Sequence, residues 1–148
     1  MAVSALWYGP AIEGQYGTTA ARRIDWVTDT IKVALATSTY TPNQDTHDFF
    51  NDVTNEVSGT GYTAGGATLG SKTVVYSGAS NKLVLDAADT SWATATFTAR
   101  YAIVYKDTGS AATSPLMGYV DFGGDQTVNS ATFTIAWDAD GVLKGVAS

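Results

Sequence analysis

Polar and apolar residues alternate along several short stretches of the chain, a pattern that places one set of side chains on each face of a β-strand. Residues 131–137 are the clearest case, because Phe133, Ile135 and Trp137 alternate with threonine and alanine. Similar patterns predict strands over further ranges: residues 30–38, 73–76, 82–86, 99–105, 116–122 and 142–146. We therefore expect a mainly β protein.

Two of these predictions concern neighbouring strands. Residues 73–76 and 82–86 are separated by a short glycine-containing segment, which predicts a β-hairpin. Residues 99–105 are apolar on both faces, since Ala102 and Val104 oppose larger apolar side chains. A strand of this kind is covered from both sides, so we expect it at the centre of a sheet.

Many short strands separated by turn residues are typical of a single-domain β-sandwich or Greek-key-like domain, rather than of a doubly wound α/β fold. The predicted core follows from the strand faces and contains Val33, Leu35, Ile103, Tyr105, Phe133, Ile135 and Trp137. One short helix is expected over residues 45–52, with Asp45 or Thr46 as its N-cap.

The first residues of the chain do not fit the strand pattern. They mix glycines with aromatic residues, which is poor for regular structure yet too apolar for a solvated tail. We divide the chain into an irregular N-terminal arm, residues 1–20, and a β-domain, residues 21–148. The large apolar residues of the arm are the predicted contacts with a partner: Trp7, Tyr8, Ile12 and Tyr16. The alternative is that the arm covers a sheet edge of its own domain.

Composition and charge exclude several classes of site and of partner. The chain has 148 residues, no cysteine and a formal net charge of −6. Without cysteine, disulfide scaffolds, zinc ribbons and thiol catalysis are excluded. The acidic balance argues against nucleic acid, because neutralising several phosphates needs clustered Lys and Arg. There is no apolar run of about 18 residues and no basic signal-peptide start, so we expect no membrane partner and no standard secretion signal.

Catalytic chemistry has little support in the sequence. His47 lies among Asp45, Asp48 and Asp52, and a His–Asp pair can act as base and orienting group. The sequence has no G-x-S-x-G nucleophile motif, so we interpret His47 as structural and expect no catalytic residue. Residues 59–64 match G-x-G-x-x-A, but a predicted strand follows where a dinucleotide site needs a helix, and we expect no cofactor.

Residues 138–141, Asp-Ala-Asp-Gly, resemble the start of a calcium loop but lack its later ligands. A plain turn is the favoured interpretation, and no metal site is assigned. Asp121 and Asp125 would add carboxylates near Asp138 if the fold brought them together, which the sequence leaves open.

The tryptophans Trp26, Trp92 and Trp137 would stack on sugars if they were exposed. Core packing is the favoured interpretation, because Trp137 continues the face of Phe133 and Ile135.

Three stretches carry a resemblance to known proteins. They are IDWVTDTIKVALATSTYTPNQDTHDFFNDVTNEVSGTGYTAGG over residues 24–66, TSWATATFTARYAIVYKDTG over residues 90–109 and SPLMGYVDFGGDQTVNSATFTIAWDADGVL over residues 114–143. Together they resemble a family of small tailed-bacteriophage proteins that are thought to be virion structural proteins, often head decoration (cement) proteins. Residues 7–23 match this family only loosely.

The resemblance implies a capsid decoration protein without enzymatic activity that stabilises the head by bridging major capsid subunits. The expected partners are the major capsid protein and further copies of the chain, with a trimer expected at three-fold junctions. We expect synthesis in the host cytoplasm and a final place on the outer surface of the head. The alternative is a fibre or tail accessory protein that binds a host receptor or glycan, for which exposed Trp or Tyr in a concave patch would be the distinguishing feature.

Overall fold

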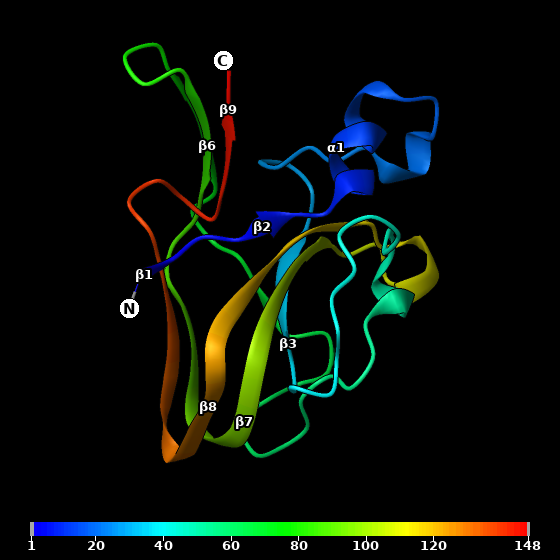
Figure 1. Ribbon diagram of the computed structural model, residues 1–148. Helices are drawn as coiled ribbons and strands as arrows, with labels where there is room; N and C mark the ends of the chain where they lie inside the picture. The colour runs from blue at the N-terminus through cyan, green and yellow to red at the C-terminus, as the bar shows by residue number, and fades with distance from the viewer. Residues whose placement is uncertain (1, 148) are drawn as a thin grey trace.

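The computed structural model describes residues 2–147 and is mainly β, as expected (Figure 1). Its strands are β1 Ala2–Val3, β2 Leu6–Trp7, β3 Ile31–Ala36, β4 Ala67–Thr68, β5 Thr73–Ser77, β6 Lys82–Asp86, β7 Thr90–Lys106, β8 Leu116–Trp137 and β9 Leu143–Val146. The α-helix of the described residues is α1, Gly9–Tyr16, and 3₁₀ turns lie at Ala20–Arg22, Phe50–Asp52 and Ala111–Thr113.

The larger sheet is built around the long antiparallel hairpin of β7 and β8, which dominates Figure 1. Its strand order is β1-β8-β7-β3-β4, and β2 also pairs with β8. The predicted strand at residues 99–105 is part of β7 and lies between β8 and β3, so its central position is confirmed. Register shifts interrupt the β7–β8 ladder at several points, as between Trp92 and Ala95, and such bulges bend and twist a hairpin.

The smaller sheet has the order β5-β6-β9, and the hairpin predicted from residues 73–76 and 82–86 is confirmed by continuous β5–β6 pairing. Leu85 and Leu143 of this sheet join Val33, Leu35 and Ile135 of the larger sheet in one buried cluster. Two sheets packed through a shared core make a single sandwich-like β-domain, the predicted fold class.

A second buried cluster covers the opposite face of the larger sheet. It contains Tyr8, Ala11, Ala34, Ala36, Tyr40, Ile103, Tyr105 and Leu116. Ile103 and Tyr105 were predicted to share a core with Val33 and Leu35, and that assignment is wrong. The two sets point to opposite faces of the sheet, and segments outside both sheets cover the second face, which strand periodicity does not reveal.

The position of the helix differs from the prediction. Residues 45–52, where a helix was expected, form turns and a short 3₁₀ segment, and the helix lies at Gly9–Tyr16 instead. Pro10 stands in its first turn, a position that needs no N–H donor. β1 and β2 pair with β8 through Ala2↔Ala136 and Leu6↔Tyr119, so the part of the predicted arm from Ala2 to Trp7 lies along the larger sheet of its own domain.

Candidate interaction surface

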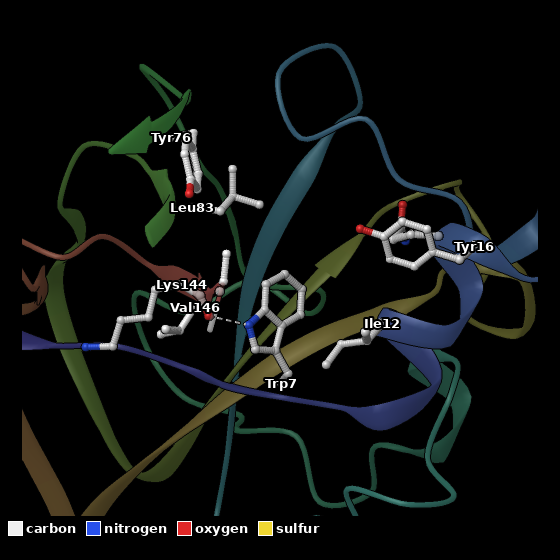
Figure 2. A pocket seen from close by; sticks show the side chains of 10 residues that line it. Trp7, Ile12, Tyr16, Tyr76, Leu83, Lys144 and Val146 are labelled. Carbon is white, nitrogen blue, oxygen red and sulfur yellow. Dashed lines mark hydrogen bonds between the residues drawn. The ribbon is translucent and has the colours of Figure 1, made fainter. Parts of the chain in front are cut away.

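An open groove of about 540 Å³ lies between α1 and the smaller sheet (Figure 2). Its lining is mostly apolar and contains Trp7, Ile12, Gln15, Tyr16, Tyr76, Leu83, Lys144, Gly145, Val146 and Ala147. A second cavity of about 230 Å³ adjoins it through Trp7, Gln15 and Leu83. We call the larger feature the α1–β9 groove. Its volume is in the range of ligand and side-chain pockets in proteins.

The helical wall of the α1–β9 groove is held in place by Tyr8, the residue immediately before α1. Tyr8 is fully buried, and its hydroxyl lies 2.9 Å from that of Tyr40. Burial raises the pKa of Tyr8 far above its usual range, and the hydrogen bond to Tyr40 acts in the same direction, so the phenol stays neutral. With this end fixed, α1 presents Ile12 and Tyr16 to solvent, at 48% and 89% exposure.

The floor of the groove is Trp7, whose indole N–H donates to the Lys144 carbonyl at 2.7 Å (Figure 2). Trp7 belongs to β2 and pairs with Gly118 of β8. A Cβ on Gly118 would come within 2.6 Å of the Leu6 carbonyl oxygen, so the close approach of β2 depends on glycine at this position.

The sheet wall comes from Tyr76, Leu83 and Val146. Tyr76 and Leu83 are directly paired across β5 and β6, so their side chains lie on the same face and point toward the groove. All three are exposed, and with Ile12 and Tyr16 they gather much of the exposed apolar surface of the described chain in one place. Contiguous exposed apolar surface is typical of interaction sites.

Two polar side chains at the groove, Gln15 and Lys144, already have partners within the chain. The Gln15 side-chain amide donates to the carbonyls of Ala11 and Arg22, and its oxygen accepts the Ile24 N–H. Lys144 lies 3.3 Å from Asp140, which also binds Lys82. These two lysines lower the pKa of the Asp140 carboxyl, with Lys82 having the larger effect. The groove therefore suits an apolar, uncharged ligand surface better than a polar one.

The predicted contact residues of the arm divide into two groups. Trp7, Ile12 and Tyr16 line the groove, as a contact surface requires. Tyr8 does not, and its assignment as a partner contact is wrong, because it is fully buried against its own domain. Tyr8 precedes α1 in extended backbone and packs inward against Tyr40, whereas Tyr16 ends α1 and faces solvent. The sequence pattern predicts no helix here, so it does not separate the two residues.

The sheet half of the groove was not predicted. Tyr76, Leu83 and Val146 lie on predicted strands, but their exposure was not foreseen. The available signal was the sequence Thr-Val-Val-Tyr-Ser, which is apolar on both faces without any charge. The same pattern describes a strand buried on both faces, so it does not by itself distinguish the two situations.

His47 lies in a turn and contacts the tyrosines that anchor α1. Its Nδ1 is 2.9 Å from the Tyr40 hydroxyl and 3.4 Å from the Asn43 backbone nitrogen. Since the Asn43 N–H can only donate, Nδ1 accepts, and Tyr40 donates to it while accepting from Tyr8. His47 is thus part of the packing of the second cluster.

The carboxylates considered for a cation do not converge. Within residues 2–147 no group of three or more His, Asp or Glu side chains is arranged to hold a metal ion. Asp121 pairs with Arg100 at 2.6 Å, which lowers the pKa of Asp121. Residues 138–141 form a turn closed by the Gly141 N–H and the Asp138 carbonyl.

The remaining motifs have structural positions. Trp26, Trp92 and Trp137 are buried, which confirms core packing. Residues 59–64 form a loop against β7, where Thr60 bridges to Thr96.

No helix in the described part of the chain is long and apolar enough to cross a membrane. Comparison with protein-family models, curated proteins and solved structures finds no match.

Proposed function

We propose that the chain is a structural protein of a tailed-bacteriophage particle, with capsid decoration as its role: it binds major capsid subunits and stabilises the head. The observation that carries the proposal is the α1–β9 groove, an exposed and mostly apolar surface. The resemblance of residues 24–66, 90–109 and 114–143 to phage virion proteins supports the same class. A role in protein contacts, without catalysis, accounts for both the exposed groove and the resemblance.

The groove is suited to receive side chains from another protein. Tyr16 and Tyr76 stand at its two sides, and large rigid aromatic residues of this kind are enriched in protein interfaces. A partner segment placed here would cover Ile12, Leu83 and Val146, which are otherwise exposed to water. Repetition of such a contact around a head would stabilise the shell without requiring a strong individual contact.

The test uses heads of the encoding phage assembled without this protein. Purified full-length chain is expected to co-sediment with these heads and to raise the temperature at which they release DNA. Tyr16→Ser removes an exposed aromatic side chain of the groove without touching the core, so we expect weaker binding by a folded protein. Val27→Ser is the matched control, because Val27 is exposed but lies outside the groove.

Failure of the wild-type chain to bind heads would contradict the decoration role. Binding to tails or fibres, but not to heads, would move the protein to another part of the particle. Equal binding by Tyr16→Ser, Val27→Ser and wild type would show that the α1–β9 groove is not the contact surface.

A second candidate is a fibre or tail accessory protein that binds a receptor or glycan. The specific observation in its favour is that Trp7, Tyr16 and Tyr76 are aromatic residues lining a concave surface. Sugar recognition also needs polar groups that fix the hydroxyls, and those of Gln15 and Lys144 are engaged within the chain. We therefore favour a protein ligand, and binding of the purified chain to host cells or isolated host glycans would reverse that preference.

A further inference from the structure

The second cavity, of about 230 Å³, is closed on one side by buried side chains, and we call it the inner pocket. It adjoins the α1–β9 groove through Trp7, Gln15 and Leu83. Its other lining residues are Ala11, Ile24, Trp26, Val74, Leu85 and Met117. Most of these are buried, whereas Val74 and Leu83 are 45% and 37% exposed. The pocket therefore opens toward solvent at β5 and β6.

The polar side chains of the inner pocket already have partners within the chain. The indole N–H of Trp7 donates to the Lys144 carbonyl at 2.7 Å, and that of Trp26 donates to the Asp86 carbonyl at 3.2 Å (Figure 2 shows the first bond). The Gln15 amide donates to two backbone carbonyls, and its oxygen accepts a backbone N–H. None of the described residues that line the pocket is charged. A charged ligand would lose its hydration here without gaining a partner, so the lining selects an uncharged ligand.

The volume of the inner pocket sets the size of this ligand. An apolar cavity of about 150 Å³ in another protein stays dry and is large enough to bind benzene. The inner pocket is larger, so it has room for one ring with a short substituent. Because the pocket adjoins the α1–β9 groove, the substituent can extend into the groove.

The lining also favours an aromatic ring over an aliphatic group of the same size. Trp7 and Trp26 contribute two aromatic side chains, and Met117 contributes a thioether. Aromatic rings attract one another beyond the effect of burial, and thioether sulfur makes favourable contacts with aromatic rings. An aliphatic group would gain from burial alone.

We propose that the inner pocket binds one uncharged aromatic ring. The ring belongs either to a free small molecule or to a phenylalanine-like side chain of a protein that lies in the α1–β9 groove. The ligand chemistry is the same in both cases. This inference goes beyond the proposed function, because it is tested with the purified chain alone and without any phage particle.

The test follows the indole N–H signals of the full-length chain by two-dimensional NMR. Toluene serves as the free ring, and N-acetyl-phenylalanine amide carries the same ring on a peptide backbone. The signals of Trp7 and Trp26 should shift to saturation, with a dissociation constant for toluene of about 1 mM or tighter. Trp92 and Trp137 do not line the pocket, so their signals should stay in place. Binding of toluene alone would assign the pocket to free molecules, and binding of the amide as well would extend it to a protein side chain.

A tethered ring provides the matched pair of variants. Val74 lines the inner pocket from an exposed position, so Val74→Phe places a ring of the chain itself at the opening. This ring should weaken toluene binding at least about tenfold, because it competes at a high effective concentration. Val75→Phe is the control, since Val75 is also exposed but points to the opposite face of β5. It should bind toluene like wild type, and circular dichroism should show both variants folded.

Two further comparisons test the ligand chemistry. Benzoate has a ring of the same size with a charge, and it should not shift the Trp26 signal. Benzyl alcohol should bind at least about twofold more tightly than cyclohexylmethanol, which has the same substituent on an aliphatic ring.

Several results would overturn the proposal. A Trp26 signal that does not move with toluene would exclude the ring, and a shift of Trp7 alone would place it in the α1–β9 groove instead. Unchanged toluene binding by Val74→Phe would show that the ring lies elsewhere. Benzoate that binds as tightly as toluene, or equal binding of the two alcohols, would contradict the assigned chemistry. Each of these results leaves the decoration role standing, because binding to heads tests that role separately.

Discussion

Ile135 shows how strongly strand alternation fixes the register of this fold. It is buried in the larger core cluster, while its neighbour Thr134 is exposed. We expect Ile135→Ala to cost about 2–5 kcal/mol in free energy of unfolding, from lost burial and the cavity left behind. Thr134→Ala should change it by less than about 1 kcal/mol. Urea denaturation of the two variants measures the difference, and similar midpoints would contradict the assigned register.

Gly66 is a residue at which backbone geometry and space both require glycine. Its φ is +75°, and a Cβ there would come within 1.9 Å of the Val33 carbonyl oxygen. Gly109 has a similar φ of +87°, but a Cβ at that position meets nothing within 4 Å. Gly109→Ala should therefore cost about 1–2 kcal/mol from backbone strain alone.

Gly66→Ala adds a clash with the backbone of β3 to the same strain. We expect it to cost at least about 2 kcal/mol more than Gly109→Ala, as overpacking commonly does. Thermal unfolding of both variants provides the measurement. Equal losses would mean that β3 moves away at no cost.

At the scale of elements, β3 is tied to the end of β7 by an ion pair that should make stability depend on acid. Lys32 lies 2.6 Å from Asp107, and Asp107 also accepts the Gly109 N–H. The hydrogen bond from Lys32, with that of Gly109, lowers the pKa of Asp107. A lowered carboxyl pKa stabilises the fold above its unfolded pKa of about 4, and this contribution disappears as the pH falls further.

Asp107→Asn should therefore lower the unfolding temperature near neutral pH and flatten its fall below about pH 4. Asp45→Asn is the control, because Asp45 is exposed and forms no ion pair within residues 2–147. Melting curves from neutral to acid pH test both. Parallel curves for wild type and Asp107→Asn would exclude this carboxyl as a source of acid sensitivity.

The elements also show where sequence patterns suffice. The β5–β6 hairpin was predicted because a glycine-containing turn joins two short strand-forming runs, and the central part of β7 because residues 99–105 are apolar on both faces. The short strands β1, β2 and β4 have two residues each, too few for any period to be seen. α1 was not predicted because its residues show almost no amphipathic pattern; their sequence is Gly-Pro-Ala-Ile-Glu-Gly-Gln-Tyr.

For the whole molecule, the class of fold follows from many weak local patterns that agree. The candidate site does not, because the α1–β9 groove combines residues from opposite ends of the chain, such as Trp7 and Val146. Their proximity depends on β2 lying along β8 and on β9 lying beside β6. Such long-range placement leaves no trace in local periodicity, so only one wall of the groove could be named in advance.

The pairing of β1 with β8 has a consequence for the order of folding. Ala2 lies opposite Ala136, so this contact closes almost the whole chain, whereas β7 and β8 are joined by the loop of residues 107–115 alone. The longer closure costs about 2 kcal/mol more in chain entropy. We expect the hairpin to form first and the N-terminal strands to dock last. On the ribosome, Tyr8 and Ala11 then join the second buried cluster of the larger sheet only when synthesis is nearly complete.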